Sequence, residues 1–183
     1  MPMIYIENKN IALIPYTHGD APDMYTCWQD HNTQRGYNCR FSLSYEEFSS
    51  TEISAFPFWC VILDKSVHTK LGVLRLGPDP KEPDLAIWIY PLFRGKGIGT
   101  NAFYLALDYI FSMLTYDTIS AGCYEDNVVS LKMLHRLGFI HIPEEDISER
   151  NCFTGEPIRQ LVLKMTRSRW SQIKRGTSFV GNN

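Results

Sequence analysis

The sequence predicts a single mixed α/β domain whose core is a sheet of about seven short strands with flanking helices. Two observations carry this prediction. Short apolar runs recur along the chain, and two clear helical patterns separate the later ones. With 183 residues, of which 44% are hydrophobic, the chain can bury one ordinary core, and it contains no internal repeat.

The first half of the chain holds four of the expected strands and a long helical region. Residues 16–57 are polar and dotted with aromatic residues, so we expect one or two helices there, one starting near Pro22 and another containing Tyr45–Phe48. Residues 77–83 (GPDPKEP) form a strong turn signal. The strands are expected at residues 11–14, 59–63, 71–76 and 85–89.

The second half begins with a glycine-rich segment and the most regular helical pattern of the chain. Its apolar residues fall on a single helix face, at Phe103, Ala106, Leu107, Ile110, Phe111 and Leu114. A second helix is expected over 127–137, where Gly138 can take a left-handed turn and Phe139 can pack back on the helix. The remaining strands are expected at residues 118–123, 139–142 and 160–165.

The chain after residue 166 is basic and has no clear core pattern. We therefore divide it into a domain of residues 1–166 and a solvated basic tail of residues 167–183.

Composition limits the classes of function. A net charge of −2 argues against bulk binding to nucleic acid. The five cysteines include no CxxC pair, so we expect neither a disulfide framework nor a metal site. No secretion signal is visible, and no run approaches the about 18 apolar residues of a membrane span. We expect a cytoplasmic protein, monomeric or homodimeric.

The segment 89–100 (IYPLFRGKGIGT) is the most informative part of the sequence. Glycines let the backbone approach a ligand, and the first turn of the following helix offers unpaired N–H groups to an anion. Arg94 and Lys96 are expected to add positive charge there. Two nucleotide motifs fail: Lys96 precedes Gly97 rather than Ser or Thr, and Thr100 stands where a dinucleotide fingerprint needs a third glycine.

The spacing Arg94-x-x-Gly97-x-Gly99 resembles the Gln/Arg-x-x-Gly-x-Gly/Ala signature of the GNAT N-acetyltransferases, which bind acyl-CoA. A strand and an Asn-initiated helix ending in Gly-Phe follow in that family, as do residues 118–123 and 127–139 here. The resemblance is specific over residues 84–139 and loose from residue 11 to residue 165. It implies a single-domain GNAT-like fold with a splayed acyl-CoA cleft.

The resemblance also implies a binding site for acetyl-CoA. The pyrophosphate would lie on backbone amides of Arg94, Gly95, Lys96, Gly97, Ile98, Gly99 and Thr100. The pantetheine arm would meet backbone groups of Ile87, Trp88 and Ile89, and also Asn127 and Ser130. For Asn127 a plain helix N-cap is the alternative interpretation.

One position departs from the family pattern. Many members carry a tyrosine that protonates the leaving thiolate where this chain has Leu134. His135 points about 100° away around a helix and is expected on the surface. Tyr124 is an acid candidate by proximity only. The pattern is most like the Rim-type branch, which acetylates protein N-termini, with close relatives acting on small amines.

In that branch the strand before the signature begins with an acidic residue, a position that Asp84 occupies. Asp84 is therefore the candidate base, and a turn residue is the alternative. The resemblance implies direct acetyl transfer to a primary amine, either a protein N-terminus or a small molecule. A non-catalytic acyl-CoA-binding regulatory module is the other function considered. The acceptor is expected to bind near Trp28, His31, Tyr37 and Phe41, none of which receives a role.

Overall fold

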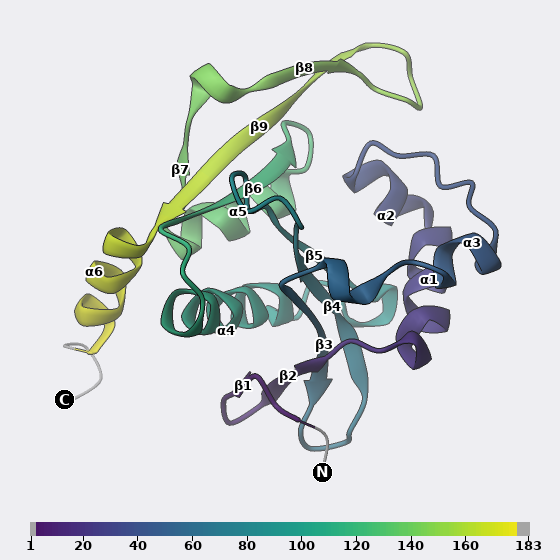
Figure 1. Cartoon of the computed structure of the whole chain (residues 1–183). Coiled ribbons are helices and arrows are strands. Elements are labelled where there is room, and N and C mark those ends of the chain that lie inside the picture. The colour runs from purple at the N-terminus through teal and green to yellow at the C-terminus, as the bar shows by residue number, and fades with distance from the viewer. Residues whose placement is uncertain (1–2, 179–183) are drawn as a thin grey trace.

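Two antiparallel sheets form the centre of the molecule (Figure 1). The computed structural model describes residues 3–178. The first sheet has the order β1-β2-β3-β4-β5, and the second has the order β6-β9-β7, with β8 also paired to β9. The strands are β1 Ile6–Glu7, β2 Ile11–Pro15, β3 Phe58–Asp64, β4 Lys70–Leu76, β5 Leu85–Ile89, β6 Thr118–Tyr124, β7 Ile140–His141, β8 Ile147–Arg150 and β9 Pro157–Thr166.

All seven predicted strands are present, and the structure adds the short β1 and β8. The two sheets touch between β5 and β6, where Asp84 and Ser120 form an isolated parallel bridge. The Ser120 N–H donates to the carbonyl of Pro83 at 3.0 Å. Beyond this junction the two strands no longer pair, so the expected single sheet is split into two.

Helices flank the two sheets. They are α1 Ala21–Gln29, α2 His31–Gly36, α3 Tyr45–Ser49, α4 Ile98–Met113, α5 Val128–Leu137 and α6 Arg167–Ser178. Of these, α1 and α4 lie on opposite faces of the first sheet, whereas α5 and α6 contact β6 and β9 of the second. Alternate residues of a strand point to opposite faces. Cys60 and Leu74 accordingly pack with α4, whereas Trp59 and Val73 pack with Met24 of α1. No described helix is long and apolar enough to cross a membrane.

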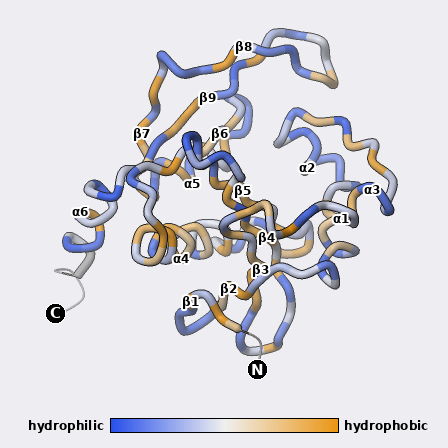
Figure 2. Tube along the Cα trace, viewed as in Figure 1, coloured by the Kyte–Doolittle hydropathy of each residue, from blue (hydrophilic) through white to orange (hydrophobic). Residues whose placement is uncertain are grey.

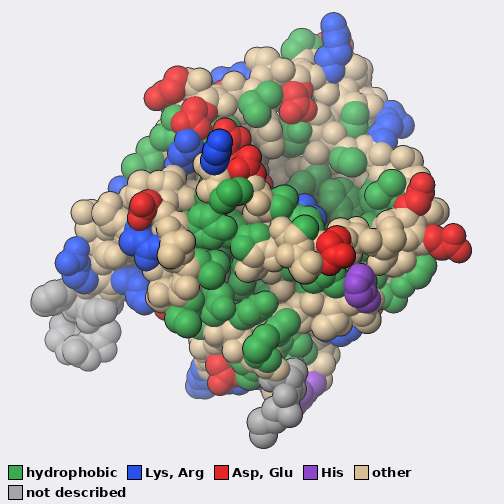
Figure 3. All heavy atoms as spheres, viewed as in Figure 1, with side chains coloured by type: hydrophobic (Ala, Val, Ile, Leu, Met, Phe, Trp, Pro, Cys, Tyr) green, Lys and Arg blue, Asp and Glu red, His purple; other side chains and the backbone are tan. Residues whose placement is uncertain are grey.

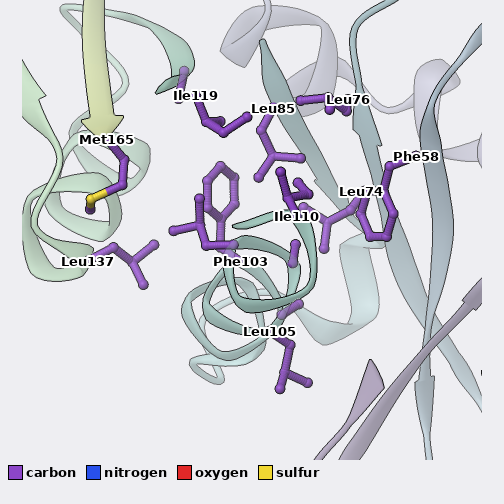
Figure 4. Packing of buried hydrophobic residues seen from close by; sticks show 14 of the residues in the cluster. Phe58, Leu74, Leu76, Leu85, Phe103, Leu105, Ile110, Ile119, Leu137 and Met165 are labelled. Carbon is purple, nitrogen blue, oxygen red and sulfur yellow. The ribbon is translucent and has the colours of Figure 1, made fainter. Parts of the chain in front are cut away.

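The helix α4 holds the two sheets together. Its apolar face places Phe103 and Ile110 in one cluster with Leu85 of β5, Ile119 of β6 and Met165 of β9 (Figure 4). The predicted helix face is therefore the face that is buried. Hydropathy along the chain follows the same division, with apolar residues concentrated in the central strands and α4 (Figure 2).

The prediction of a solvated tail is wrong for residues 167–178, which form α6. Trp170 is 2% exposed and meets the ring of Tyr104 at 4.7 Å. The Arg167 guanidinium donates to the carbonyls of Leu114 at 2.8 Å and Tyr116 at 2.6 Å, just after α4 ends. This helix therefore belongs to the domain. Residues 179–183 lie outside the described part of the chain.

Candidate active site

A cleft opens where β5 and β6 separate, and its walls come from α2, β5, β6 and α5. Leu71 accepts a hydrogen bond from Tyr90 N–H, and Asp84 accepts one from Gly77 N–H, so even-numbered residues of β5 bond to β4. Antiparallel pairing alternates, so the N–H and C=O groups of Ile87 and Ile89 point away from β4, toward β6. The cleft has a volume of about 150 Å³. Figure 3 shows this face of the molecule hollowed near its centre.

Asp84 is an exposed residue at the end of this cleft where β5 and β6 meet. Its Oδ1 accepts a hydrogen bond of 3.0 Å from Gly122 N–H, which fixes the carboxylate beside β6. It borders both the cleft and a second, open cavity of about 860 Å³ over the β6–β9–β7 sheet. Desolvation raises the pKa of Asp84, against the smaller opposing effects of Gly122 N–H and the charge of Arg75. A carboxylate with a raised pKa is a better proton acceptor than an ordinary one.

Two glycines of the glycine-rich turn adopt the left-handed backbone conformation. Gly95 and Gly97 have φ of +76° and +74°, where a side chain is strained, and a Cβ at either would meet no other atom. Gly97 is the N-cap of α4 and makes no side-chain cap, so the N–H groups of the first turn stay available. Gly99 is different, because a Cβ there would lie 3.3 Å from Met133 Sδ.

The Arg94 side chain has other partners than predicted. Its guanidinium donates to Asp30 Oδ2 at 2.7 Å, to Thr33 Oγ1 at 2.6 Å and to the Ile89 carbonyl at 3.1 Å. It ties the turn to the start of α2, and Asp30 neutralises its charge. The positive charge that Arg94 was expected to add at the turn is therefore paired with Asp30. Lys96 is exposed and keeps its ammonium at the turn.

The α5 wall of the cleft carries the second group of predicted residues. Asn127 Oδ1 accepts a hydrogen bond of 3.2 Å from Ser130 N–H, so Asn127 is the N-cap of α5. Its Nδ2 donates to the Gly36 carbonyl at 3.3 Å. Leu134 is 2% exposed and lines the cleft, so this position offers no proton. His135 is exposed, as predicted.

Two tyrosine hydroxyls lie at the cleft. Tyr37 donates to the Ile87 carbonyl at 2.5 Å and stacks on Trp88 at 5.0 Å. Tyr37 received no role from the sequence, because only its position among the aromatic residues after α1 hinted at a place near the acceptor. Tyr124 donates to Glu149 Oε2 at 3.0 Å, and burial, then Glu149, raises its pKa to about 12. Tyr124 therefore offers a hydroxyl from β6, whereas the tyrosine of the family pattern would stand on α5, at Leu134.

The other potential reactive groups are restrained. Cys123 is buried, and desolvation raises the pKa of its thiol to about 11, which disfavours the nucleophilic thiolate. Among residues 3–178, no group of three or more His, Cys, Asp or Glu residues is arranged to hold a metal ion.

A loop from the second sheet closes the outer side of the site. The turn between β8 and β9 bonds to the segment after α2: Cys152 N–H donates to Asn38 Oδ1 at 2.8 Å, and Arg40 Nε donates to the Cys152 carbonyl at 2.8 Å. These hydrogen bonds join the segment after α2 to the second sheet, although Asn38 and Cys152 are 114 residues apart in the sequence.

Comparisons with known proteins agree with this geometry. The acetyltransferase (GNAT) domain family matches residues 10–140. The mouse alpha/beta-tubulin-N-acetyltransferase 9 is 21% identical over 86% of this chain and 74% of that protein. A Vibrio cholerae spermidine N-acetyltransferase, solved with CoA and spermine, has a TM-score of 0.79 at 18% identity, covering 89% of this chain and 99% of that one.

A ribosomal-protein-S5-alanine acetyltransferase from Vibrio fischeri superposes with a TM-score of 0.72 at 17% identity, covering 90% of this chain and 97% of that one. At such identities the structural matches establish the fold, and the family match over residues 10–140 establishes the membership. The chain therefore belongs to the GNAT acetyltransferase family and is an N-acetyltransferase that uses acetyl-CoA.

Proposed function

We propose that the protein transfers the acetyl group of acetyl-CoA directly to a primary amine, with Asp84 as the proton acceptor. The observation that carries this proposal is the Asp84 carboxylate itself. It lies where β5 and β6 separate, borders both cavities and has a raised pKa.

The residues present fit acetyl-CoA as cosubstrate. Gly95 and Gly97 leave open space over the first turn of α4, whose N–H groups suit the pyrophosphate within segment 94–100. The carbonyls of Ile87 and Ile89 already accept from Tyr37 and Arg94, so it is their N–H groups, which point away from β4, that suit the pantetheine arm and the thioester. Asn127 already bonds to Ser130 and Gly36, so a pantetheine contact through its Nδ2 would require the Gly36 bond to open.

The chemistry sets two demands on these residues. The acceptor amine must lose a proton, since lysine-type amines have a pKa near 10.4 and α-amines about 7.7–8.0. Asp84 accepts that proton directly or through a water in the open cavity. An N–H group of β5 donates to the thioester oxygen as its negative charge grows. The CoA thiolate, with a pKa near that of a free thiol at about 8.5, leaves without help from Leu134.

No acyl-enzyme is needed for this reaction. Cys123 is the cysteine that lines the cleft, and its thiol is buried with a raised pKa. Direct attack by the amine avoids a buried thiol as nucleophile.

The acceptor class proposed is a protein N-terminus or a small primary amine, as in the Rim-type branch. The open cavity beside Asp84, with a volume of about 860 Å³, suits an acceptor of either kind. A cytoplasmic location is proposed as well, because all five cysteines are free thiols, as expected in a reducing compartment.

A non-catalytic acetyl-CoA-binding module is the second candidate, favoured by Leu134 on the cleft wall. An acceptor screen separates the two. Release of CoA thiol is measured with free N-terminal peptides, polyamines, aminoglycosides and amino acids. Saturable release with one class supports the enzyme, whereas acetyl-CoA binding without release on the whole panel supports the module.

The same screen is run on Asp84→Asn, with Asp79→Asn as the matched control. Asp79 is an exposed carboxylate in the same connection, and its Oδ1 accepts from Lys81 N–H, a bond that an amide oxygen keeps. Loss of turnover in the first variant alone supports the role of Asp84.

A further inference from the structure

A guanidinium without a carboxylate partner lies on the same sheet face as Asp84. Arg75 is a residue of β4, placed opposite Trp59 of β3 and Ala86 of β5. Its guanidinium carbon lies 4.4 Å from the ring centre of Phe56, 5.3 Å from that of Trp59 and 5.4 Å from that of Trp88. Three aromatic rings therefore surround this cation.

The hydrogen-bonding capacity of Arg75 is unused among the described residues. Its Nε is buried without a partner, and the side chain forms no hydrogen bond or ion pair with any of residues 3–178. Arg75 is half-buried, and its two terminal nitrogens are not among the buried unpaired atoms. A guanidinium stays charged at any physiological pH, so the protein holds an open cationic donor between aromatic walls.

Asp84 forms no ion pair with this cation, although each charge acts on the pKa of the other. Asp84 stands opposite Gly77, and Arg75 stands opposite Ala86, so the two residues are diagonal neighbours on adjacent strands, with Cα atoms about 7–8 Å apart. The carboxylate of Asp84 is held by Gly122 N–H instead. A carboxylate and a guanidinium thus face the same side of the sheet, separated and unpaired.

Aromatic side chains connect Arg75 to the lining of the cleft. Trp88 contacts Arg75 on one side and stacks on Tyr37 on the other, and Tyr37 and Ala86 both line the cleft. The Arg75 guanidinium therefore lies beside the cleft wall, next to Ala86, its direct cross-strand neighbour.

We propose that Arg75 forms a subsite for an anionic group of the acceptor, so that the preferred acceptor is a peptide with a free α-amine and an acidic side chain at its second or third residue. The proposal rests on the proposed acetyl transfer at Asp84. An extended peptide advances about 3.3–3.6 Å per residue, so the diagonal separation of about 7–8 Å spans about two residues. A carboxylate would accept two parallel N–H bonds from the terminal nitrogens.

The same charge disfavours another class of acceptor. A polyamine would bring a second ammonium beside this guanidinium, and the repulsion between like charges disfavours that approach. The subsite therefore selects acidic peptide N-termini against polyamines.

The experiment measures kcat/KM on three peptides that differ only at positions two and three, where they carry Glu, Gln or Lys, and on spermidine. The enzymes are the wild type, Arg75→Gln, Arg75→Lys and Arg136→Gln. Arg136 is exposed on α5 and supplies the matched control for the loss of one arginine charge.

The wild type and Arg136→Gln are expected to favour the Glu peptide over the Lys peptide by about tenfold or more, the size of one charge-assisted contact. Arg75→Gln should bring this ratio to within about threefold of unity, and Arg75→Lys should keep part of it. If Arg75 only packs against the rings, its variants lower kcat/KM for all three peptides by one common factor, and that result overturns the proposal.

The wild type alone also decides the matter, whether or not the variants fold. Acetylation of peptides without a charge preference, or faster acetylation of spermidine, overturns the Arg75 subsite and leaves the proposed transferase function standing. Absence of turnover on every amine, with acetyl-CoA bound, refutes the proposed function itself.

Discussion

Replacing Asp84 by Asn is expected to lower turnover strongly while leaving the fold and acetyl-CoA binding intact. The amide oxygen can still accept the 3.0 Å bond from Gly122 N–H, so the junction of the two sheets is kept. The variant loses the proton acceptor. General-base catalysis contributes about 10²-fold or more, so we expect kcat/KM to fall by at least about 10², or about 2.7 kcal/mol of the barrier.

The pH dependence follows from the direction of the pKa shift. Activity requires the carboxylate, so wild-type kcat/KM should fall as the pH drops through the pKa of Asp84. Because desolvation raises that pKa, the fall should occur above the ordinary range of an aspartate. In Asp84→Asn this acidic limb should be absent.

The same shift predicts a gain in stability for the variant. The folded state holds the Asp84 proton more tightly than the unfolded chain. Its contribution to stability is complete below the unfolded pKa, about 3.9 for Asp, and is lost as the pH rises through the folded pKa. At neutral pH the Tm of Asp84→Asn should therefore equal or exceed that of the wild type, and any excess should shrink toward acidic pH.

The assays are CoA-thiol release over a pH series, calorimetry with acetyl-CoA and thermal unfolding. Asp79→Asn should match the wild type in all three. Wild-type turnover by Asp84→Asn across the whole pH profile would show that Asp84 is only a turn residue. A parallel loss of acetyl-CoA affinity would show instead that the substitution disturbs the cofactor site.

Three further substitutions or measurements test the remaining parts of the site. Gly97→Val forces a β-branched residue to φ of +74° and should weaken acetyl-CoA binding about tenfold or more in calorimetry, and unchanged affinity in a folded variant would contradict the placement of the pyrophosphate. Wild-type protein mixed with acetyl-CoA alone should show no stoichiometric acetyl adduct in intact mass spectrometry, because the Cys123 thiol is buried with a raised pKa; a rapid adduct removed by an added amine would refute direct transfer. Leu134→Tyr should raise kcat only slightly, since thiolate departure is not the harder step, and its bulk at a 2% exposed position should cost about 1–3 kcal/mol in unfolding experiments; a large gain in kcat would mean that proton delivery limits the wild type.

The features predicted from sequence are those that local patterns encode. The apolar face of α4 follows the helical period, the strands follow short apolar runs, and the left-handed turn after α5 falls at Gly138, as predicted. The position of Asp84 before β5 was also visible, because strand and turn signals meet there.

The role of α6 was not predictable in this way. It meets the domain through Trp170 and its basic side chains, and this apolar content is too sparse to give a periodic signal. Trp170 is buried because the fold places it against Tyr104 of α4.

The partners of the polar side chains at the site were decided by the tertiary structure. Arg94 bonds to Asp30, 64 residues away, and Asn127 to Gly36, 91 residues away. The sequence shows the charge of Arg75 but not that three aromatic rings surround it without a carboxylate. Periodicity reports which face of an element is apolar, whereas a hydrogen bond or ion pair depends on which distant element the fold brings within about 3 Å.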